Sequence, residues 1–260
     1  LEMPVVNETC SIATITEVTD TIAGDCENEY TVTRTFTASD NCGNSTGPQT
    51  QTIQIVDTTA PVIEGGMDAT VECDGAGNLA EYQAWLDNHA GASATDACSA
   101  PAWSHEEGEF VAACAATGSR SVVFIATDAC GNSASFTGNF VIEDTTPASF
   151  AGDLQLEFEC TEFDMDSSYV TVEDICGDVT LTWVDNEISG GCVKPIGRYL
   201  RLYTAVDECG NVSQYEQSVL LVDNVAPELT VPAGFTVECD VEIVYEDASA
   251  TDACADPVIT

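Results

Sequence analysis

The sequence predicts an all-β protein of tandem β-sandwich repeats, stapled by disulfides and carrying one short inserted helix. Three observations support this prediction. Short phrases recur along the chain, apolar and polar residues alternate between them, and 13 cysteines occur without a single Cys-x-x-Cys pair. Recurrence indicates repeats, alternation with a period of two indicates half-buried strands, and unclustered cysteines indicate disulfides in an oxidising, extracellular setting.

The recurring phrases define two complete repeats and two partial ones. Asp-x-Cys-Gly-Asn occurs at 40–44, 128–132 and 207–211, and a linker phrase that ends in proline begins at Asp57, Asp144 and Asp223. We therefore expect boundaries near these aspartates and number the repeats in chain order: repeat 1 (1–57, C-terminal part), repeat 2 (58–144), repeat 3 (145–223) and repeat 4 (224–260, N-terminal part). The sequence is expected to be a fragment of a longer protein.

Each complete repeat has four cysteine positions, which we number first to fourth. Repeat 1 holds the second to fourth positions and repeat 4 the first two, so truncation explains the odd total without a reactive thiol. In chain order the cysteines are Cys10, Cys26 and Cys42; Cys73, Cys98, Cys114 and Cys130; Cys160, Cys176, Cys192 and Cys209; Cys239 and Cys254.

A strand is expected before the fourth cysteine of each repeat, and another after it. Two, four and six residues before that cysteine the sequence has an aspartate, an alanine and an aromatic residue, and this alternation is typical of a half-buried strand. The inward aromatic positions are Phe36, Phe124 and Tyr203. In the following strand the inward positions are Ile53 and Ile55, Phe140 and Ile142, and Val219 and Leu221.

The inserted helix is expected in repeat 2 alone, around 79–90. The first two cysteines are 25 residues apart there but only 16 apart in repeat 3. Within the longer segment Leu79, Tyr82, Leu86 and Ala90 fall on one helical face. Asn78 is expected to cap the start of this helix and Gly91 its end.

The composition excludes several classes of function. The chain has 45 acidic residues against five basic ones, a net charge of −40, and 44% hydrophobic residues. Nucleic acid is excluded as a partner because phosphate binding needs clustered Lys and Arg, and no apolar run is long enough for direct membrane insertion. There are only two histidines, and no phosphate loop, nucleophile elbow or zinc spacing appears. The sequence therefore predicts no enzyme and no catalytic residue.

These motifs resemble a known type of domain. The pattern Ala-x-Asp-x-x-Gly-Asn, then a strand, then Asp-Thr-Thr-x-Pro resembles the hyalin-repeat type of immunoglobulin-like domain. With four cysteines per repeat, the chain looks most like the tandem repeats of large Bacteroidota cell-surface adhesins of the gliding-motility type, which the type IX pathway exports. The resemblance covers the whole chain. It implies immunoglobulin-like sandwiches at the cell surface.

Four cysteines in one repeat allow three disulfide connectivities. In the strand order A, B, C, F, G the first and third cysteines lie at the end away from the incoming linker, and the second and fourth at the linker end. Strand F spans about eight residues, or roughly 26 Å, whereas a disulfide needs Cα atoms within about 7 Å. We therefore expect Cys73–Cys114, Cys98–Cys130, Cys160–Cys192, Cys176–Cys209 and Cys10–Cys42. Cys26, Cys239 and Cys254 are then expected to lack partners.

Recurrent acids beside the turns have two interpretations. Three acids are expected to gather at each junction, where they could bind Ca²⁺ through carboxylate oxygens. Alternatively, each aspartate closes its own turn by accepting a bond from backbone N–H. The candidate metal ligands are Asp57, Asp96, Asp128, Asp144, Asp174, Asp207, Asp223 and Asp252.

Two further sets of residues are singled out. Arg34 and Arg201 occupy the same repeat position and are expected to pair with acids on neighbouring strands. Asp-Thr followed by a small or apolar residue resembles the O-glycosylation motif of Bacteroidota proteins, which implies Thr21, Thr58 and Thr145 as glycosylation sites. A plain turn sequence explains these residues equally well.

Taken together, these features predict a non-enzymatic extracellular repeat region that forms the stalk or filament of a bacterial surface adhesin, acting in adhesion or gliding motility. The expected partners are neighbouring repeats of the same chain, and surface glycans or other cell-surface proteins. The alternative is a spacer or glycan-binding module of a large secreted enzyme. A shared aromatic platform would favour glycan binding, but Trp85, Trp103 and Trp183 do not recur at one repeat position.

Overall fold

The computed structural model describes residues 2–9, 12–190 and 197–254, and the chain is all-β as predicted. It divides into two compact units. Unit 1 comprises Leu1–Val71, Asn78–Val111 and Gly118–Ile142, and unit 2 comprises Glu72–Gly77, Ala112–Thr117 and Glu143–Thr260. Repeat 2 therefore contributes to both units. Each of the six sheets in the described part of the chain is formed by strands of one predicted repeat.

Repeats 2 and 3 share one strand order. In repeat 2 a four-stranded sheet has the order β5-β9-β8-β7 and a two-stranded sheet pairs β4 with β6; in repeat 3 the orders are β11-β15-β14-β13 and β10-β12. β11 runs parallel to β15, and the other neighbours in its sheet are antiparallel. Two sheets in each complete repeat make the predicted sandwich.

The strands of the complete repeats have the following bounds. Repeat 2 contains β4 (Val62–Glu64), β5 (Ala69–Glu72), β6 (Ser93–Thr95), β7 (Ala102–Ala112), β8 (Gly118–Thr127) and β9 (Ser133–Glu143). Repeat 3 contains β10 (Ser149–Ala151), β11 (Gln155–Glu159), β12 (Thr171–Glu173), β13 (Val179–Gly190), β14 (Gly197–Asp207) and β15 (Val212–Val222).

The partial repeats contain complementary parts of this pattern. Repeat 1 has a three-stranded antiparallel sheet, β1 (Ala13–Ala23), β2 (Tyr30–Asp40) and β3 (Gln49–Ile55), which correspond to β7, β8 and β9. Repeat 4 has only the two-stranded pair β16 (Glu228–Thr230) and β17 (Ser249–Thr251), which correspond to β4 and β6. The described part of repeat 4 therefore lacks the large sheet.

The alternation of apolar residues is confirmed in the complete repeats. Phe124 and Tyr203, six residues before the fourth cysteine, are fully buried, as are the alanines two residues later. Phe140 and Val219 on the following strands are buried as well. In repeat 1, which has no second sheet in the described residues, Phe36 is only half-buried.

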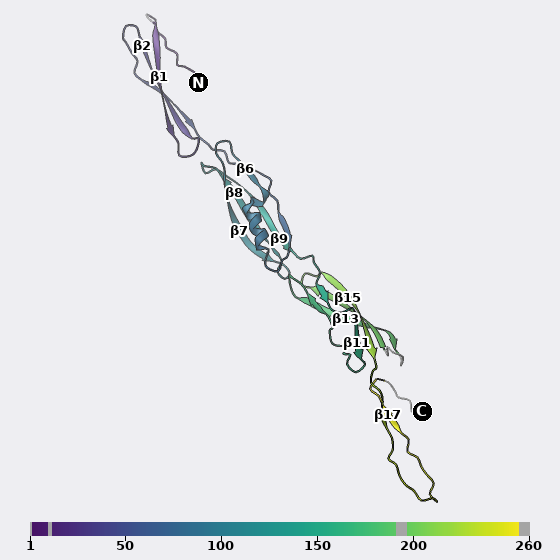
Figure 1. The fold of residues 1–260 in the computed structure, drawn as a ribbon. Helices are drawn as coiled ribbons and strands as arrows, with labels where there is room; N and C mark the ends of the chain where they lie inside the picture. Colours follow the sequence, from purple (N-terminus) through teal and green to yellow (C-terminus); the bar gives the residue numbers. More distant parts are fainter. Residues whose placement is uncertain (1, 10–11, 191–196, 255–260) are drawn as a thin grey trace. The chain divides into compact units, whose positions relative to one another are not determined.

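The predicted helix is present in repeat 2, and helices occur nowhere else in the described residues. α1 (Leu79–Asp87) leads into a short 3-10 helix, η1 (His89–Gly91), and Figure 1 shows it beside β7 and β9. Its apolar side covers the sheet, with Leu86 and Ala90 buried against Val122 and Phe124. None of the helices in the described ranges is long and apolar enough to cross a membrane.

Two details of the predicted helix are wrong. Leu79 is 71% exposed, and Trp85 packs on Phe124 instead, with ring centroids 5.2 Å apart. An aromatic ring buries more apolar area than leucine, so Trp85 determines which side of the helix faces the sheet. Asn78 makes no side-chain cap bond, because its backbone is left-handed (φ 52°) and not in the extended region that an N-cap residue needs.

Repeat 3 has a buried arginine where repeat 2 has Val122. Arg201 is fully buried and makes two 2.6 Å bonds to Asp185, which lies opposite it on β13. It also donates to the carbonyl oxygens of Ser167 and Met165 at 2.6 and 2.8 Å. Arg34, at the same position in repeat 1, pairs with Glu17 on β1 at 2.6 Å. The predicted acidic partners of both arginines are confirmed.

Aromatic rings surround the Arg201 guanidinium. Its central carbon lies 5.2 to 5.9 Å from four ring centroids, those of Phe163, Tyr169, Trp183 and Tyr203. The first two rings belong to the loop between β11 and β12. This loop therefore covers the large sheet in repeat 3, a role that the helix has in repeat 2.

Replacing Arg201 with methionine should lower the free energy of unfolding by about 3–5 kcal/mol, because Asp185 stays buried without its partner. Urea unfolding of the oxidised protein measures this. The matched control is Arg198→Met on the same strand, where the side chain is exposed and a change within about 0.5 kcal/mol is expected. Equal effects of the two substitutions would contradict the assignment.

Candidate functional site: the cysteine-linked junctions between repeats

Four disulfides are present in the described residues, and each joins two neighbouring repeats. Their Cα–Cα distances are 5.1 to 6.0 Å, within the normal range. They close loops of 94 to 104 residues. The pairs are Cys26–Cys130, Cys73–Cys176, Cys114–Cys209 and Cys160–Cys254.

The pairing follows one rule. The first cysteine of a repeat bonds to the second cysteine of the next repeat, in Cys73–Cys176 and in Cys160–Cys254. The third cysteine bonds to the fourth cysteine of the next repeat, in Cys26–Cys130 and in Cys114–Cys209. Each half of the rule is met by two disulfides, so the pattern is a property of the repeat. We call this pairing between successive repeats the disulfide register.

The predicted pairing within repeats is therefore wrong. Cys73–Cys114, Cys98–Cys130 and Cys176–Cys209 do not form, and Cys160 bonds to Cys254 instead of Cys192. Cys42 is free rather than bonded to Cys10; Cys10 and Cys192 lie outside the described residues. Cys26 and Cys254, which were expected to lack partners, are both bonded, whereas Cys239 is free as expected.

The sheet order explains why the first and third cysteines of one repeat do not pair. Cys73 follows β5 at one edge of the sheet, and Cys114 lies in the turn between β7 and β8 at the opposite side. At about 4.8 Å per strand, they are separated by roughly 12 Å, beyond the reach of a disulfide. Both lie at the end away from the incoming linker, as predicted, and there they meet cysteines of the next repeat.

Hydrogen bonds support the cysteines at the junction between repeats 1 and 2 and at the junction between repeats 2 and 3. Two residues after the third cysteine, Asn28 donates its side-chain amide to the carbonyl oxygen of Cys98. At the same repeat position, the backbone N–H of Ala116 donates to the carbonyl oxygen of Cys176 at 3.2 Å. In both cases the acceptor is the second cysteine of the next repeat, so these bonds follow the register of the disulfides.

A glutamate before the first cysteine holds the outgoing linker. Glu72 accepts bonds from the backbone N–H of Thr145 and from the hydroxyls of Thr145 and Thr146, at 2.7 to 2.9 Å. These bonds hold the pKa of Glu72 below its ordinary value. Glu159 accepts from the backbone N–H of Asn224 at 2.8 Å in the same way. Sequence reasoning missed this role, although the repeated Val-Glu-Cys phrase marked the position.

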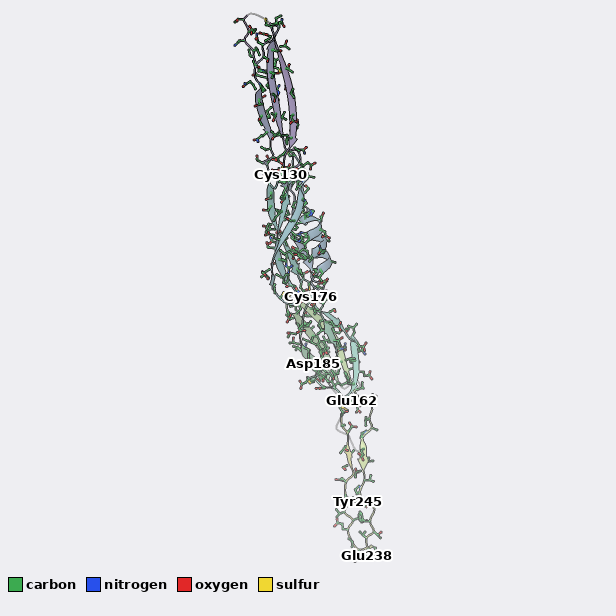
Figure 2. All side chains as sticks on the ribbon, turned by 90° about the vertical axis from the view of Figure 1, so that its left-hand side faces the viewer. Cys130, Glu162, Cys176, Asp185, Glu238 and Tyr245 are labelled. Atoms are coloured by element: carbon green, nitrogen blue, oxygen red, sulfur yellow. A yellow bond between two sulfur atoms is a disulfide. The ribbon has the colours of Figure 1, made fainter. Side chains whose placement is uncertain are left out.

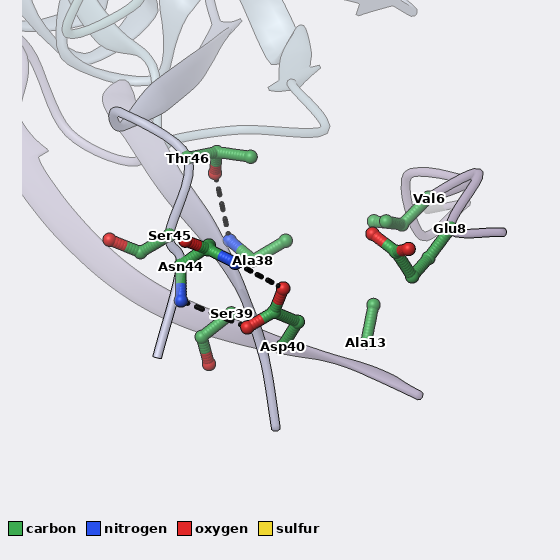
Figure 3. Close-up of a pocket in the computed structure, with 9 residues that line it drawn as sticks. All are labelled: Val6, Glu8, Ala13, Ala38, Ser39, Asp40, Asn44, Ser45 and Thr46. Atoms are coloured by element: carbon green, nitrogen blue, oxygen red, sulfur yellow. Dashed lines mark hydrogen bonds between the residues drawn. The ribbon is translucent and has the colours of Figure 1, made fainter. Parts of the chain in front are cut away.

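The Asp-x-Cys-Gly-Asn phrase forms a turn closed by its own aspartate. Figure 3 shows this turn in repeat 1, where Asp40 accepts from the backbone and side chain of Asn44. Asp128 and Asp207 make the same bonds to Asn132 and Asn211.

In the complete repeats the turn asparagine has a second role. Asn132 and Asn211 also donate to the carbonyl oxygens of Asp57 and Asp144, at 3.2 and 3.0 Å. The side chain of each asparagine thereby joins its turn to the incoming linker. Through this bond the fourth cysteine, which lies within the turn, is held next to the start of its repeat.

Only part of each predicted set of acids clusters beside the second cysteine, because Asp128, Asp207 and Asp252 do not belong to the clusters. Side-chain ligand atoms of Asp57, Asp96 and Cys98 lie within 4.8 Å of one another, and so do those of Asp144, Asp174 and Cys176. A third cluster combines Glu159, Asp223 and Cys254. Burial and the nearby Asp57, Asp96 and Asp128 raise the pKa of the Cys98 thiol. Burial and the charges of Asp174 and Asp207 raise the pKa of Asp144.

The donor set of these clusters fits turn closure better than calcium. Asp128 and Asp207 use both carboxylate oxygens in their turns. The aspartate two residues before each second cysteine accepts the backbone N–H of that cysteine through one oxygen; these are Asp96, Asp174 and Asp252. The first aspartate of each linker accepts a backbone N–H from the residue two positions later; these are Asp57, Asp144 and Asp223. Calcium requires six to eight oxygens, so these carboxylates alone do not supply its shell. The calcium site stays a prediction.

The threonines suggested as glycosylation sites are all exposed. Thr21 lies on β1 and Thr58 in the linker after repeat 1. The hydroxyl of Thr145 donates to Glu72 at 2.9 Å. That bond favours a turn role for Thr145, and glycosylation stays a prediction for all three.

Comparisons with known proteins do not identify a family. No family model matches the chain, and no curated protein sequence matches it. Among solved structures, the human desmocollin-1 ectodomain is 13% identical with a TM-score of 0.28, covering 76% of this chain and 49% of its own. A protocadherin gammaB7 fragment is 12% identical with a TM-score of 0.30, covering 81% and 68%. Drosophila N-cadherin is 11% identical with a TM-score of 0.23, covering 87% and 72%. The chain thus spans about half the length of the desmocollin chain.

Replacing Asp207 with alanine should lower the free energy of unfolding by about 1–3 kcal/mol at pH 7, because the turn loses its acceptor. Burial raises the pKa of Asp207, but the bonds from Asn211 outweigh it and hold that pKa below its ordinary value. A depressed pKa stabilises the fold above the unfolded-state pKa, and this contribution is lost as the pH falls through the folded-state pKa. The difference in the free energy of unfolding between the variant and the parent should therefore shrink below about pH 4.

Thermal unfolding with and without excess chelator provides the control for this prediction. If the acids close turns, the chelator leaves the midpoint unchanged, and Asp207→Ala lowers the midpoint equally in both conditions. If the chelator lowers the unfolding midpoint of the parent protein but not that of the Asp207→Ala variant, the result would contradict turn closure and support calcium binding.

Proposed function

We propose that this chain is a load-bearing, non-enzymatic repeat region of an extracellular surface protein. The observation that carries the proposal is the disulfide register, because bonds between successive repeats limit how far the polypeptide can lengthen under tension. Eight cysteines in bonds of this kind are typical of proteins in an oxidising, extracellular compartment. The resemblance of the sequence motifs to those of Bacteroidota adhesins supports the proposal that the region belongs to the stalk or filament of such a protein.

The disulfides shorten the covalent path along the chain. From Cys26 the path crosses to Cys130, follows the backbone to Cys160 and crosses to Cys254. Only 30 residue steps separate Cys130 from Cys160, whereas 228 separate Cys26 from Cys254 along the backbone. Tension applied at the termini would therefore reach this short path long before the repeats could unfold fully.

The short path consists largely of strands that are already extended. It contains β9, the linker after Asp144, β10 and β11. A β-strand rises about 3.3 Å per residue, close to the limit of about 3.6 Å for a fully stretched chain. Breaking the hydrogen bonds of these strands therefore yields little additional length.

Charge and packing fit an extracellular spacer. A net charge of −40 keeps such chains soluble and mutually repelling. The tryptophans favour a packing role over a glycan platform: Trp85 packs on Phe124, Trp103 stacks on His89 with centroids 4.6 Å apart, and Trp183 lies beside Arg201. A spacer within a secreted enzyme, the alternative function, would use the same limit that the disulfides set on lengthening of the chain.

Single-molecule force spectroscopy, with the chain pulled at its two termini, tests the proposal. The shortest covalent path of the oxidised protein has about 61 residue steps, against 259 for the reduced chain. At about 3.5 Å per step, these paths correspond to roughly 210 Å and roughly 900 Å when fully stretched. We expect the oxidised chain to stop lengthening near the smaller value.

Two paired variants sharpen the test. Removing Cys114 and Cys209 leaves the short path intact, so the limit should stay near roughly 210 Å. Removing Cys26 and Cys130 forces the path through Cys73–Cys176 and should raise the limit to roughly 330 Å. An oxidised protein that reaches the full reduced length, or identical limits for the two variants, would contradict the load-bearing role.

A further inference from the structure

The outer face of the large sheet in repeat 3 is apolar. On β14, Arg201, Tyr203 and Ala205 are fully buried on the inner face, so the residues that alternate with them point to the outer face. Figure 2 labels Asp185 on β13, the strand beside β14. Apolar residues of β13, β14 and β15 lie next to one another on the outer face and form what we call the repeat 3 patch. It consists of Val184, Leu200, Leu202, Val206, Val212 and Leu220.

The two sides of the repeat 3 patch are open to solvent. Val184 is 62% exposed and Val212 is 54% exposed, so no second layer in the described residues covers them. Leu200 and Leu202 are half-buried, because their strand has a neighbour on each side. A contiguous exposed apolar patch on a protein surface usually marks a site of interaction. The outer face of repeat 3 is therefore a candidate for a contact with another molecule.

Repeat 2 does not have this patch. Its sheet has the same strand order, but polar residues stand at several of the matching positions, counted from the third and fourth cysteines. Val184, Leu200 and Val212 of repeat 3 correspond to Glu106, Ser121 and Ser133 of repeat 2. Because repeat 2 forms the same sheet with these polar residues, the fold itself does not require an apolar outer face. The patch is a particular property of repeat 3.

Charge indicates which partner fits the repeat 3 patch. The chain has 45 acids and five bases, yet the outward positions from Thr180 to Asn186 on β13 and from Arg198 to Val206 on β14 include no acid. Their single charged residue is Arg198, and β15 adds Glu216 on the same face. Two copies of so acidic a chain repel each other over most of their surface. This face is one where they can approach, with apolar residues opposite apolar residues and with one base and one acid in each copy.

We infer that repeat 3 binds repeat 3 of a second copy of this chain face to face, in a two-fold arrangement centred on Leu200. Leu200 lies midway between Arg198 and Leu202 on β14, and Glu216 is the cross-strand neighbour of Leu202. A two-fold axis that crosses the strands at Leu200 exchanges the positions of Arg198 and Leu202. Arg198 of each copy therefore lies over the row that contains Glu216 of the other copy, and the same patch is buried on both.

The area of the patch fits a weak, reversible contact. Three strands of about ten residues, spaced about 4.8 Å apart and rising about 3.3 Å per residue, cover roughly 480 Å² in each copy and roughly 950 Å² in two. Specific interfaces start at about 1,000 Å². The contact therefore joins copies side by side and forms fully only at high local concentration. This inference does not rest on the load-bearing role.

Sedimentation equilibrium of the oxidised protein, with its free thiols alkylated, tests this contact. Salt at about 0.5 M screens the repulsion between the copies. We expect a monomer–dimer equilibrium that is measurable below about 1 mM. Val184→Glu and Leu200→Ser introduce the residues of repeat 2, and each change occurs twice in the dimer. Each should raise the dissociation constant at least about tenfold.

The matched control is Val111→Glu, the same change at a position of repeat 2 that is 66% exposed, which should leave the dissociation constant within about twofold. A protein that stays monomeric up to about 1 mM would overturn the inference and leave the patch to a partner of different sequence. Equal dissociation constants for Val184→Glu and Val111→Glu would overturn it as well.

A charge exchange tests the two-fold arrangement. Arg198→Glu and Glu216→Arg each place like charges together in the contact and should each raise the dissociation constant at least about fivefold. The double variant restores opposite charges and should return the dissociation constant to within about twofold of the parent value. A double variant that is as weak as the single variants, or single variants with no effect, would overturn the arrangement.

Discussion

This structure depends on disulfides that join neighbouring repeats. The bonds do not connect two cysteines of the same repeat. Each closes a loop of 94 to 104 residues. In the chain-entropy treatment, closing a loop of about 100 residues lowers the conformational entropy of the unfolded chain. This loss stabilises the folded state by about 4.7 kcal/mol. Between repeats 2 and 3 the two loops overlap, so their contributions do not simply add. What they share is that neither repeat can separate from the other while its cysteines stay oxidised.

Polar side chains place the cysteines for this pairing. The turn aspartates bind the backbone around the second and fourth cysteines, Glu72 and Glu159 hold the outgoing linkers, and Asn132 and Asn211 hold the incoming ones. The high acidic content thus has a local explanation at the junctions: carboxylates accept the N–H groups that turns leave unpaired. Burial, and after it the charges of Asp174 and Asp207, raise the pKa of Asp144 at one of these junctions.

The repeat pattern of the sequence predicts the secondary structure of this protein better than it predicts the disulfide partners. The strands before and after the fourth cysteine, the helix in repeat 2 and the acidic partners of Arg34 and Arg201 follow from spacing along one repeat. The ends at which the cysteines lie were also predictable. Their partners were not, because a repeating sequence looks the same whether a cysteine bonds within its own repeat or to the next one. Only the sheet order, with β5 and the β7–β8 turn on opposite sides, decides between these possibilities.

Disulfide mapping of the oxidised protein tests the central claim most directly. With only five Lys and Arg residues against 45 acids, a protease that cleaves after acidic residues suits this sequence better than trypsin. Mass spectrometry of the unreduced digest should find Cys73 linked to Cys176 and Cys114 linked to Cys209. Peptides that link Cys73 to Cys114, or Cys176 to Cys209, would place the bonds inside single repeats and contradict the account.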